Sequence, residues 1–161
     1  MEKDQFIAVL QEHRNLVFKI CRSYCANPEN RKDLQQEILI QLWKSFEKFD
    51  GRVKISTWIY KVALNTAIFY YRKDSKHSNN KVSLDASIIS LSNFEPDMQD
   101  EQITMLYQFI ERLHSLDKAL ILLYLDDNKQ KDIAEILGLS ETNVATKISR
   151  IKKNLKEQFK A

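Results

Sequence analysis

Apolar residues recur at intervals of three and four along most of the chain, and this spacing predicts α-helices with one apolar face each. The first predicted helix runs from about residue 4 to residue 25. The second begins at Pro28, a favourable first-turn residue, and continues to about residue 49. A third helix is expected up to residue 72, with Ser56 as its N-cap. These helices would bury their apolar faces against one another in one core.

The helical pattern is interrupted over residues 75–100. This segment has six serines between Ser75 and Ser92 and no sustained periodicity, apart from a short apolar patch at residues 88–91. Such a composition predicts a flexible linker. Its acidic residues could mimic nucleic acid or could simply be solvated, and both interpretations stay open. These residues are Asp85, Glu95, Asp97 and Asp100.

The linker divides the chain into an N-terminal domain of residues 1–74 and a C-terminal domain of residues 101–161, where helical periodicity returns. Glycine and proline number only two each, which disfavours an all-β fold with its many tight turns. The expected fold class is therefore all-α, with two small helical domains joined by a flexible linker.

The C-terminal stretch KQKDIAEILGLSETNVATKISRIKKNLKEQF has the spacing of a helix-turn-helix. Ala134 is small enough for a close helix approach, Gly138 suits a left-handed turn position, and Ser140 can cap the second helix. Val144 follows Gly138 by six residues as the first inward anchor. The apolar face then continues at Ile148, Ile151, Leu155 and Phe159.

The opposite face of this second helix carries short polar groups and cations. The candidate DNA-contacting residues on it are Thr142, Asn143, Thr146, Lys147, Arg150 and Lys153. Asparagine and arginine can hydrogen-bond base edges, threonine methyl groups can contact thymine, and lysine can contact phosphates. A plain solvated amphipathic helix is the alternative interpretation, but the helix-turn-helix spacing favours DNA binding.

The charge distribution supports the same interpretation. The net charge of the whole chain is only +3. Residues 101–139 hold four basic and seven acidic side chains, whereas residues 140–161 hold six basic and two acidic ones. A domain polarised in this way suits a surface that binds a polyanion on one side only.

A second polar stripe lies on the third predicted helix, which otherwise carries a heavy apolar load. Thr57, Lys61, Asn65 and Arg72 follow one another at steps of four, four and seven, and this spacing keeps them within one narrow stripe of a helix. A stripe of cations and amides can be a solvated face or a surface that recognises another molecule.

Several classes of function are disfavoured by the sequence. The chain has no Gly-rich phosphate loop, and His13, His77 and His114 are scattered, so we expect neither an enzyme nor a cofactor. A metal site at Cys21 and Cys25 would need His13 and a fourth ligand, so two reduced thiols in a helical core are favoured. No apolar run is long enough for a membrane span and the N-terminus is not signal-like, which predicts a cytoplasmic protein.

The motifs together resemble bacterial RNA polymerase sigma factors of the extracytoplasmic-function (ECF) branch. The stretch DLQQEILIQLWKSFEKFDG, followed by STWIYKVALN, resembles the domain of these factors that binds core polymerase and melts the promoter, and the C-terminal helices resemble their second promoter-reading domain. The resemblance covers nearly the whole chain in the right order. The matching N-terminal positions are Asp33, Leu34, Gln36, Glu37, Leu42, Trp43, Phe49, Gly51, Ser56, Thr57, Trp58 and Asn65.

The resemblance implies a role for each surface. Binding to the polymerase core is expected at Asp33, Gln36, Glu37 and Lys44. Contacts to the minus-ten element are expected at Arg52, Lys54, Ser56, Thr57, Lys61, Asn65 and Arg72, with the loop of residues 49–55 receiving the base that flips out. Trp58 and Tyr60 are candidate stacking platforms, although a core position is favoured for Trp58. The helix-turn-helix face would read the minus-thirty-five element. Many members of the family have a basic residue at the position of Ala145, so the base preference of the family cannot be transferred to this chain.

The resemblance also implies partners. These are RNA polymerase core, promoter DNA and an anti-sigma factor, itself expected to be membrane-associated, and no small-molecule substrate is expected. The main alternative is a stand-alone helix-turn-helix transcription regulator that binds DNA without polymerase. The surface at Asp33 and Glu37 separates the two interpretations, because a stand-alone regulator has no need of a polymerase-binding face.

Overall fold

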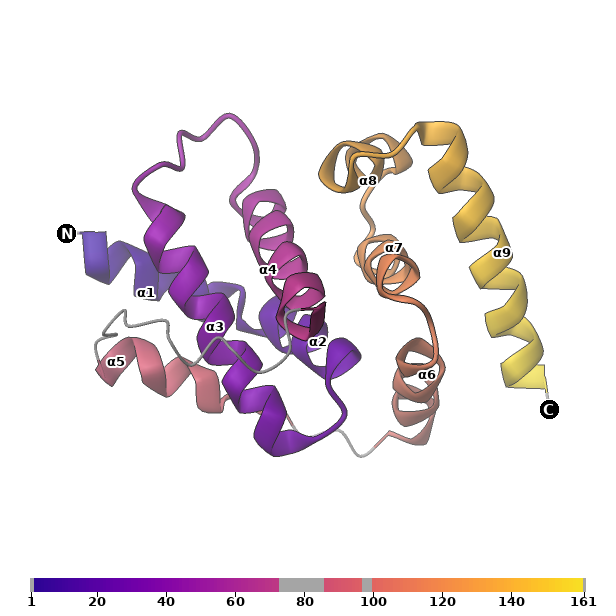
Figure 1. Ribbon diagram of the computed structural model, residues 1–161, viewed down its shortest axis with the longest axis horizontal. Coiled ribbons are helices and arrows are strands. Elements are labelled where there is room, and N and C mark those ends of the chain that lie inside the picture. The colour runs from indigo at the N-terminus through magenta and orange to yellow at the C-terminus, as the bar shows by residue number, and fades with distance from the viewer. Residues whose placement is uncertain (1, 73–85, 97–99, 161) are drawn as a thin grey trace. The chain divides into compact units, whose positions relative to one another are not determined.

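The computed structural model describes residues 2–72, 86–96 and 100–160, and every regular element in these residues is helical. The chain forms two compact units, residues 1–97 and 98–161. This arrangement confirms the predicted all-α class with two helical domains. Figure 1 labels the α-helices: α1 Glu2–Glu12, α2 Arg14–Tyr24, α3 Pro28–Phe46, α4 Ile55–Arg72, α5 Ala86–Ile89, α6 Glu101–Glu111, α7 Ser115–Leu125, α8 Gln130–Leu137 and α9 Glu141–Lys160. A 3₁₀ turn, η2 at Ser90–Asn93, follows α5.

The core of the first unit is built mainly between α2, α3 and α4, which pack side by side (Figure 1). The fully buried side chains of α3 fall on the predicted face, at Leu34, Ile38 and Leu42. Phe6 of α1 is completely buried, and its ring lies 5.0 Å from the ring of Trp43 and 5.2 Å from that of Phe46. Tilted aromatic pairs at these distances add attraction to the burial itself, so they fix α1 on the end of α3.

The first predicted helix is divided in two by the structure. His13 leaves the helical conformation, with φ −111° and ψ 18°, and separates α1 from α2. The Nδ1 atom of its ring lies 2.9 Å from the carbonyl oxygen of Val9, which binds the exposed end of α1. No apolar residue occurs between Leu10 and Leu16, so a change of direction there lets each helix bury its own apolar face.

The ends of α3 and α4 follow local sequence signals to different degrees. Pro28 is the first residue of α3 as predicted, and the Asn27 side chain accepts hydrogen bonds from the backbone N–H groups of Glu29 and Asn30 at 2.9 and 3.3 Å. The predicted N-cap Ser56 is wrong, because α4 begins one residue earlier. The backbone N–H of Trp58 donates to the Lys54 carbonyl at 3.1 Å, and Ser56 lies within the first turn.

The predicted linker needs correction over residues 86–96. Here α5, η2 and the residues that follow pack against α3 in the first unit, and Ile88 is 1% exposed. The apolar patch in this segment is therefore part of a core, because a short apolar run is buried wherever a neighbouring helix leaves room for it.

The second unit is a compact group of helices in which α9 packs against α7 and α8. Gly138 adopts the predicted left-handed conformation, with φ 70°, between α8 and α9. Ser140 caps α9 as predicted, since its Oγ accepts from the Asn143 backbone N–H at 3.1 Å. Val144, Ile148 and Ile151 are buried, which confirms the helix-turn-helix and the first part of its inward face. The predicted continuation is wrong at Phe159, which is 39% exposed, and Leu155 is only half-buried, because α9 extends beyond the helices that it packs against. Ser115 is the first residue of α7.

Candidate functional site

The outer face of α9 is the most continuous polar surface of the second unit. Thr142, Asn143, Thr146, Arg150 and Lys153 are all exposed, and they lie on the side of α9 away from the buried row. Lys147 is partly covered and lies on a flank. The fold therefore presents five of the six predicted residues fully to solvent on a helix that is fixed by its opposite face.

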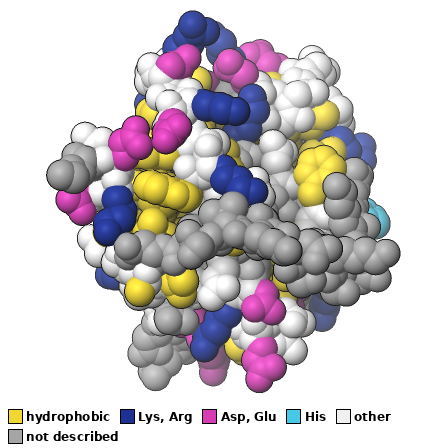
Figure 2. Space-filling view, turned by 60° about the vertical axis from the view of Figure 1, so that its left-hand side comes forward, with side chains coloured by type: hydrophobic (Ala, Val, Ile, Leu, Met, Phe, Trp, Pro, Cys, Tyr) yellow, Lys and Arg dark blue, Asp and Glu magenta, His cyan; other side chains and the backbone are white. Residues whose placement is uncertain are grey.

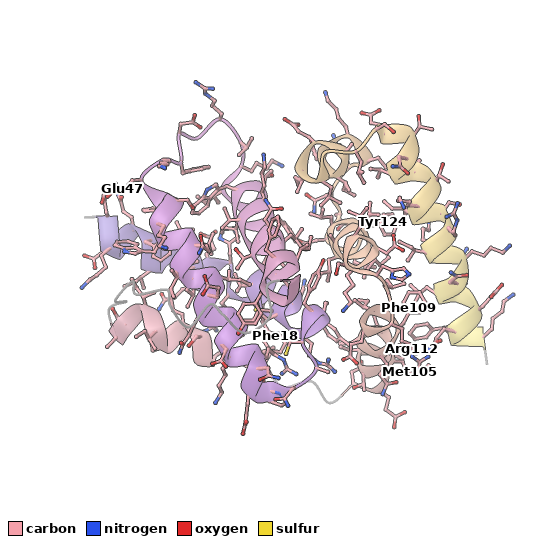
Figure 3. All side chains as sticks on the ribbon, in the orientation of Figure 1. Phe18, Glu47, Met105, Phe109, Arg112 and Tyr124 are labelled. Carbon is pink, nitrogen blue, oxygen red and sulfur yellow. The ribbon has the colours of Figure 1, made fainter. Side chains whose placement is uncertain are left out.

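The other flank of α9 contacts α7 through Lys152. Tyr124 projects from α7 towards α9 (Figure 3), and the Lys152 Nζ lies 5.0 Å from the centre of its ring. A cation over an aromatic face is attracted by the ring quadrupole. Lys152 therefore helps to hold α9 in place, whereas Lys153 next to it points into solvent.

The polar stripe of α4 is partly exposed, as its spacing predicts. Lys61 and Asn65 are exposed, Ser56 and Thr57 are half-buried, and the side chain of Arg72 lies outside the described part of the structure. The buried side of the same helix holds Ile59, Ala63, Leu64 and Ala67. One face of α4 thus builds the core, and the other offers an amide and a cation one turn apart.

The loop between α3 and α4 continues this surface. Gly51 has φ 79°, and the Asp50 side chain accepts a hydrogen bond from the backbone N–H of Arg52 at 3.0 Å and forms an ion pair with its guanidinium at 3.0 Å. Both side chains are well exposed. Val53, between Arg52 and Lys54, is 43% exposed, so the loop combines two cations with one solvent-facing apolar group.

The aromatic residues near this loop belong mainly to the fold. The ring of Trp58 lies 6.0 Å from that of Phe46 and 5.2 Å from that of Phe49, which supports the favoured core role. Tyr60 is only 3% exposed. The suggestion that Tyr60 is a stacking platform is therefore wrong, because a base cannot reach a ring covered on both sides by the core.

The polar face of α3 brings together the residues predicted to bind polymerase. Asp33, Gln36 and Lys44 are exposed, and Glu37 is half-buried and accepts a hydrogen bond from the Gln41 Nε2 at 2.9 Å. Positions 33, 36, 37 and 44 recur at helical spacing, so these side chains share one side of α3.

Tyr70 of α4 lies beside this acidic face. Burial raises the pKa of its phenol above the ordinary value, and the negative charges of Asp33, Glu37 and the neighbouring Cys25 raise it further. In the sequence, Tyr70 is part of the heavy apolar load of this helix. The structure adds that its hydroxyl is close enough to the two carboxylates of α3 for their charges to act on it.

Two further residues escape sequence reasoning. Arg31 is 7% exposed, and its guanidinium donates to the carbonyl oxygens of Cys25 and Ala26 at 3.1 and 2.8 Å. Nothing in the pattern of apolar and polar residues distinguishes Arg31 from Lys32 beside it, which is exposed. Val53 could have been noticed as an apolar residue between two cations, but only the structure shows that it has no core to join.

The two cysteines are free thiols buried in the first unit. Burial raises the pKa of the Cys21 thiol well above its ordinary value, and Cys25 nearby raises it further, while Arg31 acts in the opposite direction. Within the described residues no group of histidine, cysteine and carboxylate side chains is arranged to hold a metal ion. Among those residues, too, no helix has the length and apolar character needed to cross a bilayer.

Basic and acidic side chains are interspersed over the face of the molecule shown in Figure 2, with small apolar areas between them. No large field of one sign covers this face. The net charge of the whole chain is also small, at +3.

Comparison with known protein families accounts for both units. Residues 9–77 match the Sigma-70 region 2 model, and residues 103–155 match the Sigma-70, region 4 model. Together the two matches cover about three quarters of the chain, in the order found along it. The chain belongs to the sigma-70 family of RNA polymerase sigma factors.

Its relatives place it in one branch of that family. It is 28% identical to the RNA polymerase sigma factor SigV of Bacillus subtilis over 98% of this chain and 92% of that protein. It is 24% identical to the ECF RNA polymerase sigma factor SigW of the same organism, over 99% of this chain and 91% of SigW. The protein is an ECF sigma factor, and it is not an enzyme. A stand-alone regulator is not favoured, because region 2 of the sigma family occupies the N-terminal half.

A solved structure shares the fold. The sigma factor RpoE of Bartonella quintana, solved in complex with the anti-sigma factor NepR, matches with a TM-score of 0.72 at 17% identity, over 94% of each chain. At this identity the likeness establishes the fold alone.

Proposed function

We propose that this sigma factor divides its work among three surfaces: the α3 face binds core polymerase, α4 with the preceding loop engages the minus-ten element, and α9 reads the minus-thirty-five element. The observation that carries the proposal is that each predicted set lies mostly exposed on one side of a helix whose opposite side is buried in a core. Rigid elements of this kind can hold a binding surface in register.

The α3 face supplies carboxylates and amides for a basic partner surface. Asp33 and Gln36 are free to reorient in solvent, while Glu37 is oriented by Gln41. Charge complementarity would speed the encounter with core polymerase and fix its register. Lys44, two turns further along α3, would provide the opposite charge at the edge of the contact.

The α4 stripe and its loop suit a DNA strand that is being opened. Asn65 offers a donor and an acceptor to a base edge, and Lys61 can follow the phosphates. Arg52 and Lys54 add positive charge on the loop, where the exposed Val53 gives an unstacked base an apolar contact. Ser56 and Thr57 are half-buried at the start of α4, where the loop meets the stripe that begins at Thr57.

The α9 face suits duplex DNA. Asn143 and Arg150 can contact base edges, Thr142 and Thr146 offer hydroxyl and methyl groups, and Lys147 and Lys153 can pair with phosphates. Each good bidentate contact contributes roughly 1–3 kcal/mol of discrimination between bases.

The proposed place of action is the cytoplasm, where polymerase and promoter DNA are found. We also propose control by an anti-sigma factor that covers DNA-reading surfaces, held at the inner face of the membrane. The fold shared with a sigma factor solved in complex with an anti-sigma factor supports this control, although it does not identify the partner of this chain.

The proposal is tested by in vitro transcription with bacterial core polymerase on the DNA upstream of the protein's own operon. Asp33→Arg combined with Glu37→Arg should abolish co-elution with core, because it reverses the charge of the α3 face. Asn65→Ala should keep core binding and lower open-complex formation about tenfold or more, read by permanganate reactivity of unpaired thymines.

Glu12→Arg is the matched control for charge reversal, since Glu12 is an exposed carboxylate of α1 outside all three surfaces. It should behave like the wild type. If the wild-type chain binds duplex DNA tightly without core and never directs initiation, the proposed division of work is wrong.

A further inference from the structure

Residues 86–96, which we call the clasp, occupy a surface formed by α2 and α3 of the first unit. Ile88 and Ser92 are each 1% exposed, and Leu91 lines a small cavity together with Val17 of α2 and Leu39 of α3. The buried part of the clasp thus combines the apolar Ile88 with Ser92, whose hydroxyl donates to the Ile89 carbonyl oxygen at 2.6 Å, while the Ile89 side chain is 36% exposed.

The last residues of the clasp are held by side chains of both helices. The ring of Phe94 meets that of Phe18 of α2 edge to face at 6.2 Å, and the Arg14 guanidinium lies 4.4 Å from the centre of the Phe94 ring. Phe18 is labelled in Figure 3. The Gln35 side chain of α3 donates to the Phe94 carbonyl at 3.4 Å. Aromatic and cation–π contacts of this geometry are specific in direction.

An ion pair completes the attachment. The Arg31 Nη1 lies 2.6 Å from the Glu95 Oε1, while the same guanidinium binds the carbonyl oxygens that follow α2. The Arg31 side chain is 9% exposed and that of Glu95 is 43% exposed. Because the Glu95 carboxylate is half-exposed, solvent and salt weaken this pair.

The clasp decides how long the connection between the two units is. From Pro96, at the end of the docked clasp, to Glu101, the first residue of α6, the chain can span at most about 18 Å. With the clasp detached, the connection starts at Arg72 and can span about 100 Å.

The spacing of the two promoter elements favours the longer span. Elements at minus ten and minus thirty-five are about 25 base pairs apart, which is about 85 Å along B-DNA. Domains of this size are about 30 Å across. Even with both reading surfaces at the outer ends of their units, a docked clasp allows a separation of at most roughly 80 Å, and only a fully stretched connection reaches it.

We propose that the clasp is an intramolecular latch: docked on α2 and α3 in the free chain, it keeps the two DNA-reading domains on a short tether, and it is released when both engage a promoter on polymerase. This inference rests on the proposed function. Docking lowers the fraction of chains able to span the promoter, and therefore lowers the apparent affinity for it.

The test measures energy transfer between dyes on Lys48→Cys and Lys156→Cys in the full-length chain, both positions being exposed. Combining Phe94→Ala with Glu95→Lys should detach the clasp and lower the transfer efficiency of the free chain. The same change should raise the apparent promoter affinity of the holoenzyme about threefold or more. Glu12→Arg is the control and should change neither value. Unchanged transfer in the free Phe94→Ala, Glu95→Lys chain overturns the proposal.

A second measurement follows the clasp directly through thiol labelling, located by mass spectrometry. In the free chain Ile88→Cys should react at least about tenfold more slowly than the exposed control Ile89→Cys, and the two rates should converge in the complex with core and promoter. If only Ile88→Cys stays protected there, the latch does not open and the proposal fails. Where polymerase shields both positions, energy transfer in the complex decides, and transfer as high as in the free chain overturns the proposal. A chain that never binds core refutes the proposed function instead, while the free-chain results stand.

Discussion

At the scale of single residues, burial separates side chains that the sequence presents as alike. Arg31 and Lys32 are neighbouring cations in α3, yet Arg31 caps the end of α2 and Lys32 is solvated. Cys21 and Cys25 invite a metal or redox interpretation at helical spacing. Instead, both thiols are buried in the core and the pKa of the Cys21 thiol is raised, so the pair is inert.

The Cys21 thiol gives a pH-dependence to stability. The pKa of this thiol is raised in the folded chain, whereas in the unfolded chain the pKa is about 8.5. Stability from the neutral buried thiol is complete below that value and is lost as pH rises above it, because only the unfolded chain releases the proton. We expect the free energy of unfolding to fall by up to about 1.4 kcal/mol per pH unit from this group.

Urea unfolding between pH 7 and pH 10.5 measures this loss. Tyr70 contributes in the same direction at higher pH, since its pKa is also raised. Cys21→Ala is the comparison. Above pH 8.5 the free energy of unfolding should fall less steeply with pH in this variant than in the wild type. Parallel curves for the two chains would contradict the account.

At the scale of elements, helix ends set the position of the recognition surfaces. The α3 face depends on where α3 begins, and Asn27 fixes that start with two hydrogen bonds to backbone N–H groups. Gly138 and Ser140 do the same for α9. Caps and turn glycines act locally, which explains why the helix-turn-helix could be predicted from its residues.

Asn27→Ala should lower the free energy of unfolding by about 1 kcal/mol, because two N–H groups of the first turn of α3 lose their acceptor. Thermal unfolding followed by circular dichroism measures the change. Asn30→Ala is the matched control, since Asn30 is exposed within the helix and caps nothing with its side chain among the described contacts. An equal loss in both variants would show that the cap is not the cause.

At the scale of the whole molecule, positive charge is concentrated near the C-terminus, on the helix that we propose reads DNA. The net charge is +3, but residues 140–161 alone hold six basic and two acidic side chains. Long-range attraction by the molecule is modest for this reason, while the local field at α9 remains strong at physiological salt.

Lys153→Ala should weaken holoenzyme binding to a duplex with the minus-thirty-five element at every sequence tested, and should reduce the slope of log K against log salt by about 1. Filter binding over a series of potassium chloride concentrations gives the slope. Lys160→Ala, at the far end of α9, serves as the control and should leave it unchanged. A loss of sequence preference in Lys153→Ala would instead assign this side chain to base recognition.

The sequence by itself determined the helical class, the buried faces of α3 and of the first part of α9, the helix-turn-helix with its glycine and cap, and the family. These features depend on periodicity and on local backbone preferences, which a single chain displays directly. The roles of the individual surface residues remain predictions, and the structure adds where they are exposed.

Only the tertiary structure decided the break at His13, the burial of Tyr60 and Arg31, and the docking of residues 86–96. The docking depends on contacts between residues far apart in the chain, such as the 2.6 Å pair of Arg31 and Glu95. A weakly periodic segment carries no signal of where it will dock, because its few apolar side chains are buried only when another element supplies a matching surface.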